Sequence, residues 1–291
     1  MNKFRRTFQL PRRKNLRRKP QGLISPQTKR RLHWLPNALT LCNSWCGFAA
    51  ILWTLSAYSK IPAGGSVPTE TYNVLATASL IILGAMIFDV LDGYAARMLN
   101  ATSLHGMQMD SLSDMVTFGV APAVIMAIMT HRLQGVQTTM QVWITYLLCS
   151  VYVGCTALRL ATYNVKALEK TGDDSTFHGL PSPGAAAAIA SLVLAVRGFD
   201  RDLSKFALVF PIYAAVLGGL MVSSLPYKHL GKWLLSRKGN PTLKIMLLVV
   251  LLFMVGLFGA YAIFTVITLY VLSGPFIAIK NWLVAPGKSK R

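Results

Sequence analysis

The stretch FDVLDGYAARMLNATSLHGMQMDSLSD, residues 88–114, sets four aspartates between long apolar segments. The chain of 291 residues has only ten acidic residues, and four of them lie in this window: Asp89, Asp92, Asp110 and Asp114. The apolar sequence on both sides predicts that the acids lie at the ends of two membrane-spanning helices. Acidic side chains are costly beside lipid, so their concentration here indicates a functional site.

The composition around this window is that of an integral membrane protein. Hydrophobic residues make up 53% of the chain and charged residues 14%, whereas a soluble domain is usually about a quarter charged. Because backbone groups within lipid must be hydrogen-bonded internally, repeated long apolar segments predict a helical bundle. We therefore expect an all-α, polytopic protein with about eight transmembrane helices. The expected spans are residues 36–57, 72–95, 110–130, 141–163, 183–197, 206–225, 243–258 and 260–280, with a tight turn near Gly256–Gly259.

The basic residues predict the orientation in the membrane. Residues 1–33 carry twelve lysines and arginines and no acid, which indicates a cytoplasmic arm on anionic lipid, with a short interfacial helix over 26–34, rather than a cleaved signal peptide. With this arm inside, the inside segments hold 24 of the 30 basic residues. We expect a multi-pass protein of the cytoplasmic (inner) membrane, with both termini and the acid window on the cytoplasmic side. With a net charge of +20, the basic residues are then expected to bind anionic lipid headgroups or a phosphorylated membrane substrate rather than nucleic acid.

Helical spacing predicts that the four acids meet. Asp89 and Asp92 are three residues apart, Asp110 and Asp114 are four apart, and each pair therefore shares one helix face. The short link between the two spans makes them antiparallel neighbours. Carboxylates facing each other at low dielectric repel, so they must be protonated or must bind cations. Hard oxygen ligands favour Mg²⁺ or Mn²⁺, and such a cluster suits two ions.

Small residues and one cation accompany the acids. Gly93, Ala96 and Gly106 remove bulk beside them, so a flat or phosphorylated ligand can approach the helix backbone. Arg97 is positioned to bind a phosphate oxygen. The predicted ligand is therefore an anionic, phosphorylated molecule held through metal ions.

Together these residues spell D-x-x-D-G-x-x-A-R-x8-G-x3-D-x3-D, which is similar to the signature of the CDP-alcohol phosphatidyltransferase family. The resemblance extends over roughly residues 34–225. Two further regions resemble the phosphatidylserine synthases of bacteria and archaea within that family. They are LPNALT at 35–40 followed by Asn43 and Gly47, and ALRLATYN at 157–164 with FHGLPSP at 177–183. Thr162 and Tyr163 stand where that branch commonly has arginine and phenylalanine.

The resemblance implies an enzyme that transfers the phosphatidyl group of CDP-diacylglycerol to L-serine, giving phosphatidylserine and CMP, by metal-assisted direct attack of the serine hydroxyl. It also implies a homodimer. In this pattern Asp89, Asp92 and Asp110 would bind Mg²⁺ or Mn²⁺, with two ions expected, and Asp114 would act both as a metal ligand and as the catalytic general base. CDP would be bound by Asn37, Thr40, Asp89, Asp92, Gly93, Ala96, Arg97 and Gly106.

Arg159 is the one basic residue inside an expected span, and a charge within the membrane is by default a candidate site residue. We expect it to bind the serine carboxylate, together with Asn164 and Ser182. An ion pair between Arg159 and the aspartates is the structural alternative. The four cysteines form no C-x-x-C pair and are expected to be buried thiols.

Three parts are expected along the chain: the arm at 1–33, a six-span core at 34–225, and a final pair of spans with a basic tail at 226–291. The alternative functions are the same reaction with choline, inositol phosphate or glycerol phosphate as acceptor, a divalent-cation transporter, and a non-catalytic lipid scaffold. A transporter predicts acids through the whole depth of the membrane, and a scaffold leaves the acid spacing unexplained.

Overall fold

The computed structural model describes residues 34–59, 69–99, 103–134, 138–169, 179–198, 203–227 and 257–284, which are almost wholly helical. The expected arm at 1–33 and nearly all of the expected span at 243–258 lie outside these residues. The helices are α2 (Leu35–Ser59), α3 (Thr69–Leu99), α4 (Leu104–Asp114), the π-helix η1 (Met115–Val120), α5 (Ala121–Gln134), α6 (Thr139–Glu169), α7 (Ser182–Val196), the 3₁₀-helix η2 (Ser204–Phe206), α8 (Val209–Val222) and α11 (Ala260–Val284).

The polytopic helical architecture is confirmed. Within the described ranges, six helices are long and apolar enough to cross a membrane, and α7 is a shorter apolar helix. The third of the six runs without a break from Leu104 to Gln134 through α4, η1 and α5, so it is longer than the expected 110–130. These seven helices match seven of the eight segments expected from the sequence.

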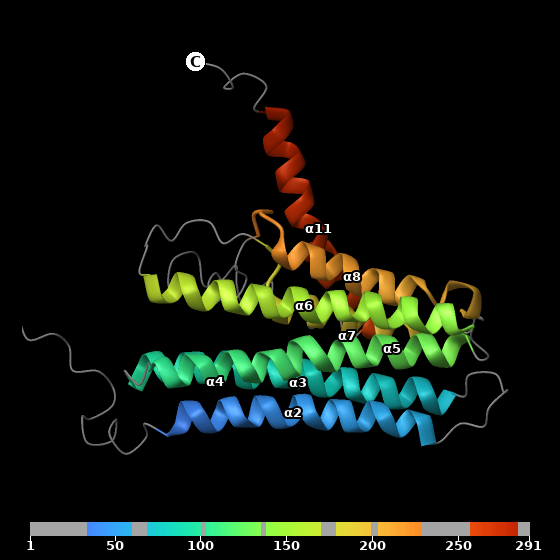
Figure 1. Cartoon of the computed structure of the whole chain (residues 1–291), viewed down its shortest axis with the longest axis horizontal. Coiled ribbons are helices and arrows are strands. Elements are labelled where there is room, and N and C mark those ends of the chain that lie inside the picture. Colours follow the sequence, from blue (N-terminus) through green and yellow to red (C-terminus); the bar gives the residue numbers. More distant parts are fainter. Residues whose placement is uncertain are drawn as a thin grey trace, which may run out of the picture.

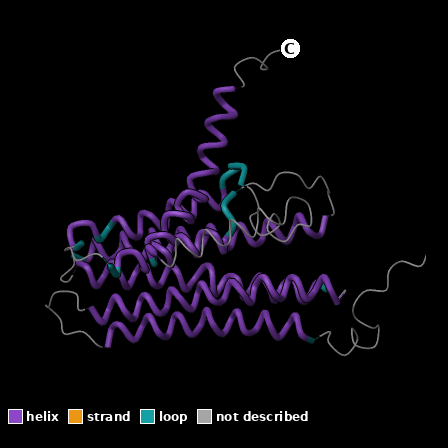
Figure 2. Tube along the Cα trace, turned by 180° about the vertical axis from the view of Figure 1, so that it is seen from behind, coloured by secondary structure: helices purple, strands orange, loops and turns teal. Residues whose placement is uncertain are grey.

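The helices form a bundle whose functional end is made by four helix termini. Helices α2 to α6 and α8 run side by side, and α7 lies among them with its alanine-rich face buried (Figure 1). The beginnings of α2 and α4 and the ends of α3 and α6 meet at the left end of the bundle in Figure 1. The view from behind shows α11 running at a steep angle to the bundle and extending away from it (Figure 2).

A π-helix follows directly after Asp114. Its last turn closes five residues back, from the Ala121 N–H to the Val116 carbonyl. Pro122 has no N–H to offer the carbonyl of Phe118, four residues earlier, and the Tyr152 hydroxyl donates to that carbonyl at 2.8 Å. The wider turn changes the direction in which the residues of α4 face relative to α5, at the point where the acid window ends.

Helix α2 lies very close to the α4–η1 segment. A Cβ added at Gly47 would come within 2.7 Å of the Thr117 Cα, so only glycine permits this approach. Two side chains then bond across the interface. The Thr117 hydroxyl donates to the Asn43 carbonyl at 2.9 Å, and the Ser113 hydroxyl donates to the Thr40 carbonyl at 2.9 Å. This contact brings the first turns of α2 against the acid-bearing end of α4.

The cysteines are free thiols, but only one of them is buried as expected. Cys149 is buried, whereas Cys42, Cys46 and Cys155 are partly exposed on their helices. The expectation of burial within the protein is therefore wrong for three of the four.

Candidate functional site

Three aspartates come together between α3 and α4. One carboxylate oxygen from each of Asp89, Asp92 and Asp110 lies within 4.8 Å of the other two. Asp89 and Asp92 lie on one face of α3 because they are three residues apart, and Asp110 reaches them from the facing helix. The prediction that the two acidic faces meet is confirmed for these three residues.

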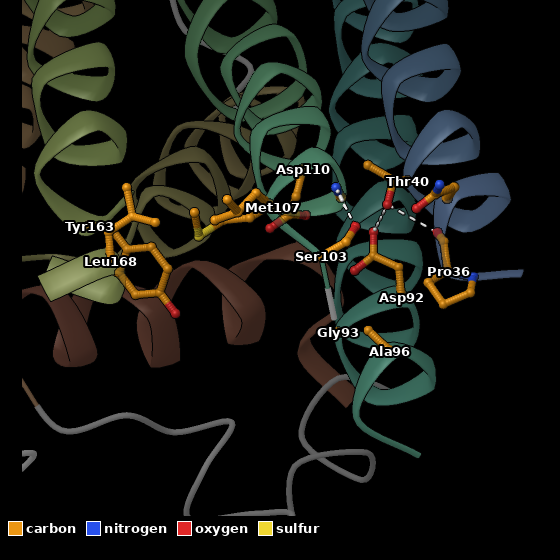
Figure 3. A pocket seen from close by; sticks show the side chains of 13 residues that line it. Pro36, Thr40, Asp92, Gly93, Ala96, Ser103, Met107, Asp110, Tyr163 and Leu168 are labelled. Atoms are coloured by element: carbon orange, nitrogen blue, oxygen red, sulfur yellow. Dashed lines mark hydrogen bonds between the residues drawn. The ribbon is translucent and has the colours of Figure 1, made fainter. Parts of the chain in front are cut away.

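Helix α2 holds one of the three acids in place. The Thr40 hydroxyl donates to Asp92 Oδ2 at 2.8 Å and also lies 3.0 Å from the Pro36 carbonyl of its own helix (Figure 3). Asp92 and Thr40 are each only 4% exposed, so this bond is shielded from water. Thr40 therefore orients a carboxylate, which accounts for a threonine on this face of α2 better than helix packing alone does.

Asp114 stands apart from the other three acids. It is not among the oxygens gathered within 4.8 Å, although it lies near enough to Asp89, Asp92 and Asp110 to interact with their charges. Asn43 donates from Nδ2 to Asp114 Oδ1 at 3.2 Å. The four acids thus divide into a group of three and a single carboxylate with its own amide partner, a division that helical spacing alone does not predict.

The group of three has the chemistry of a divalent-cation site. Among the described residues, no lysine, arginine or histidine forms an ion pair with any of the four aspartates, and Asp110 Oδ1 is buried without a hydrogen-bond partner. A buried carboxylate oxygen left unpaired is costly unless a cation satisfies it. Three carboxylates with close oxygen atoms are the donor set that Mg²⁺ and Mn²⁺ prefer. The residues present therefore fit such an ion.

A cavity of about 460 Å³ opens beside the acids. Figure 3 shows its walls, which come from the ends of four helices. The lining residues are Pro36, Asn37, Thr40, Asp92, Gly93, Ala96, Ser103, Leu104, Gly106, Met107, Asp110, Tyr163 and Leu168. All three small residues predicted for ligand approach are among them, and the volume is that of a site for a small molecule or cofactor.

The surroundings of the two glycines support this reading. Open space lies over Gly93 except for the guanidinium of Arg97, whose nearest nitrogen would be 3.8 Å from an added Cβ. A Cβ at Gly106 would be 3.5 Å from Asn37 Oδ1, and the Gly106 N–H donates to the Ser103 hydroxyl that begins α4. Asn37 therefore lines the cavity, and the Arg97 guanidinium lies beside Gly93, which also lines it.

Arg159 bonds a serine rather than one of the aspartates. Its NH1 donates to the Ser182 hydroxyl at 2.6 Å, at the first residue of α7, and it forms no ion pair with a described aspartate. Arg159 also lines a second cavity of about 220 Å³, together with Thr162, Tyr163, Lys166 and residues at the end of α8. Tyr163 lines both cavities, so the two are neighbours.

Asn164, expected beside Arg159, faces α4 instead. Its Nδ2 donates to the Ser111 hydroxyl at 2.9 Å, and that hydroxyl lies 3.1 Å from Asn164 Oδ1. The structure therefore brings Arg159 and Ser182 together and sets Asn164 against the residue that follows Asp110. Asn164 connects α6 to the acid-bearing helix.

Several residues of the site had no role in the sequence prediction. Asn43 was part of a recognised motif, and its place three residues after Thr40 could have indicated that both face the acids. Ser103 could have been identified as a helix start, because serine is a preferred N-cap. Ser111, Met107 and Leu168 carry no signal in the sequence, since their roles depend on which helix lies opposite.

Comparison with known proteins was consistent with this geometry. The family model described as CDP-alcohol phosphatidyltransferase matches residues 33–222. A Saccharomyces cerevisiae protein named CDP-diacylglycerol–serine O-phosphatidyltransferase is 36% identical over 58% of this chain and 56% of its own length. The archaetidylserine synthase of Methanothermobacter thermautotrophicus is 34% identical over 66% of this chain and 69% of its own. A Helicobacter pylori protein named CDP-diacylglycerol–serine O-phosphatidyltransferase is 30% identical over 69% of this chain and 74% of its own length.

Proposed function

The chain belongs to the CDP-alcohol phosphatidyltransferase family, and from this we propose that it transfers the phosphatidyl group of CDP-diacylglycerol to L-serine, releasing CMP. The observation that carries the proposal is the group of three aspartates at the edge of a cavity with small-residue walls. The names of the relatives favour serine as the acceptor. This chain matches little more than half of the length of the yeast relative.

The cytidine diphosphate would lie in the larger cavity. Asp89, Asp92 and Asp110 would hold Mg²⁺ or Mn²⁺, with two ions proposed, and bound ions would offset the charge of the diphosphate and of the departing CMP. Gly93, Ala96 and Gly106 leave room for the nucleotide. Arg97 and Asn37 would donate to its phosphate or base, and Thr40 keeps Asp92 oriented through their 2.8 Å bond.

Asp114 would act as the general base. It is separate from the group of three, and Asn43 bonds only to its Oδ1. The other oxygen would take the proton of the serine hydroxyl while the hydroxyl oxygen attacks the phosphorus that carries diacylglycerol, and the bond from that phosphorus to the oxygen of CMP breaks. Among the described residues that line the cavity there is neither cysteine nor histidine, which favours direct attack over a covalent intermediate.

The positions of the acids favour an enzyme over a cation transporter. Among the described helices, only α3, α4 and α6 carry acidic residues, and the group of three lies at one end of the bundle. A transport path requires ligands through the depth of the membrane. We further propose that the protein lies in the inner membrane with this end on the cytoplasmic side, among anionic lipids. We also propose that it is a homodimer.

We expect chelation of divalent ions to stop serine incorporation. Purified protein supplied with CDP-diacylglycerol and labelled serine should form phosphatidylserine, should lose at least about 100-fold in rate with excess EDTA, and should recover with Mg²⁺ or Mn²⁺. Labelled choline, inositol phosphate and glycerol phosphate, supplied one at a time, test the other acceptors. Circular dichroism before and after chelation is the control for unfolding. Full activity in EDTA would contradict the role given to the acids.

Arg159→Ala should weaken serine binding more than lipid binding. The guanidinium provides several donors for a carboxylate, and only one of them has a described partner, Ser182. We expect the KM for serine to rise about 30-fold, as for loss of a charge-assisted bond, while the KM for CDP-diacylglycerol changes less than about threefold. Lys205→Ala, the loss of an exposed cation on η2, is the matched control. A larger rise for the lipid would assign Arg159 to the phosphate instead.

A further inference from the structure

The second cavity has two walls, one from α6 and one from the end of α8. Its lining residues are Leu158, Arg159, Thr162, Tyr163, Lys166, Met221, Val222, Ser223 and Ser224. Arg159 and Lys166 are seven residues apart, so they share one face of α6 and are separated by two turns, about 10.5 Å along the helix. Thr162 lies between them, and its short side chain turns back to donate to the Leu158 carbonyl at 2.8 Å. The space between the two cations is therefore left open to a ligand.

Both cations have donors to offer in this space. Arg159 is fixed by its bond to the buried Ser182, and its Nε is buried without a hydrogen-bond partner among the described residues. A buried donor left unpaired is costly, which favours an anionic ligand beside the guanidinium. Lys166 is exposed, at the last residue of the span Thr139–Lys166. Its flexible four-carbon stem lets the ammonium approach the same ligand.

The other wall has the opposite polarity. It is the end of α8, where the carbonyl groups of the last turn give a helix its partial negative charge. The Ser223 hydroxyl lines the cavity there and donates to the Leu220 carbonyl at 2.7 Å, so its oxygen faces a ligand as an acceptor. The described residues of this wall include no lysine or arginine. The cavity therefore has a cationic wall on α6 and an electronegative wall on α8.

The loop before α7 fixes the two walls relative to each other. The Leu180 N–H donates to the Leu220 carbonyl of α8 at 3.0 Å. Two residues later, Ser182 accepts the bond from Arg159 of α6 at 2.6 Å. Because one short segment holds both walls, the spacing between their charges is preorganised, and a ligand is selected by where its own charges lie.

We propose that this cavity is the acceptor site and that its two walls select a zwitterionic amino acid: Arg159 and Lys166 bind the carboxylate, and the end of α8 at Ser223 faces the ammonium group. The proposal deepens the proposed serine transfer and rests on it. Lys166 becomes a specificity-determining residue. Choline has no carboxylate for the two cations, and glycerol phosphate has no ammonium group for the other wall. Tyr163, shared with the larger cavity, sets this acceptor beside the cytidine diphosphate.

Two serine analogues test the role of Lys166 as competing inhibitors of serine transfer. 3-Hydroxypropanoate keeps the carboxylate and lacks the ammonium group, whereas 2-aminoethanol keeps the ammonium group and lacks the carboxylate. Lys166→Met removes the charge and keeps the stem. It should raise the KM for serine and the inhibition constant of 3-hydroxypropanoate each about tenfold, as for a lost charge-assisted bond, and leave that of 2-aminoethanol within about twofold. Lys166→Arg keeps the charge and should keep all three values within about threefold.

Ser223→Ala is the reciprocal variant for the other wall. The loss of one neutral hydrogen-bond acceptor should raise the inhibition constant of 2-aminoethanol about threefold and leave that of 3-hydroxypropanoate unchanged. Lys280→Met, which removes an exposed cation on α11, is the matched control for Lys166→Met and should change none of the constants.

The outcomes separate this proposal from the function on which it rests. If Lys166→Met shifts both analogues equally, shifts neither, or raises the KM for CDP-diacylglycerol instead, Lys166 does not bind the acceptor carboxylate, while serine transfer stands. A Ser223→Ala variant that binds 2-aminoethanol as the wild type does would overturn the ammonium wall. A wild-type enzyme that does not use serine at all would overturn the proposed function itself.

Discussion

Asp110→Asn is expected to lower turnover by about 10³-fold or more, equivalent to roughly 4 kcal/mol of transition-state stabilisation. Asp110 is the one member of the group of three on α4, and its Oδ1 is buried with no hydrogen-bond partner among the described residues. An amide has nearly the same shape but carries no negative charge, so it is a much poorer ligand for a hard cation. The loss should therefore appear in metal binding as well as in turnover.

The same substitution should raise the thermal stability of the metal-free protein. Without metal, Asp110 repels Asp89 and Asp92, and its replacement by asparagine removes that repulsion. The metal-free variant should unfold about 2–4 °C above the metal-free wild type, for ~1 kcal/mol of relieved repulsion. Mn²⁺ should raise the unfolding temperature of the wild type and leave that of the variant nearly unchanged. Electron paramagnetic resonance of added Mn²⁺ measures the binding directly.

Glu70→Gln is the matched control for Asp110→Asn. Glu70 is exposed in the first turn of α3, at the end of that helix remote from Asp89 and Asp92, and the substitution makes the same change of charge. Turnover and Mn²⁺ binding should both stay at wild-type levels in this variant. The metal role would be refuted by an Asp110→Asn enzyme that keeps its Mn²⁺ affinity and turns over within tenfold of wild type.

Asp114→Asn should lower turnover by about 10²–10⁴-fold, the usual contribution of a general base. Binding should survive, because Asp114 is not one of the three acids whose oxygens lie within 4.8 Å of one another. The new amide can turn its oxygen toward Asn43 Nδ2 and keep the bond seen at 3.2 Å. We therefore expect the affinities for Mn²⁺ and for CDP to change less than about threefold, a loss confined to the chemical step.

Ser113→Ala is the control for packing next to Asp114. It removes the neighbouring buried bond to the Thr40 carbonyl and leaves every carboxylate in place. This enzyme should turn over within about tenfold of wild type, since one hydrogen bond contributes ~1 kcal/mol. An Asp114→Asn enzyme that lost Mn²⁺ binding in parallel with turnover would show that Asp114 serves chiefly as a metal ligand. Unchanged turnover would remove its role as base.

Local sequence was enough to predict most of the helices. A span within lipid is set by the length of its apolar run, so the segments at 36–57 and 141–163 correspond closely to α2 and α6. The unbroken span at 110–130 was predicted, but the π-helix η1 within it and its extension to Leu104 and Gln134 were not. The π-helical turn depends on a hydroxyl from α6, that of Tyr152, reaching the Phe118 carbonyl that Pro122 leaves without a partner.

At the site, too, contacts between helices could not be predicted from the sequence alone. Helical spacing and the short link predicted that the face of Asp89 and Asp92 would meet the face of Asp110 and Asp114. In the structure, α3 and α4 both pack against α2, and only Asp110 joins the first two acids. The separation of Asp114 from them depends on Asn43, and Asn43 reaches it only because Gly47 allows α2 to approach the π-helix.

A polytopic helical membrane protein and a set of carboxylates that meet could both be predicted from the order of residues, since they follow from single helices and one short link. Packing between helices established which helix supplies each acid with its partner, and that Arg159 bonds Ser182 while Asn164 bonds Ser111. These contacts join residues far apart in the chain. Helical periodicity defines the face on which a side chain lies, but only packing determines which helix meets that face.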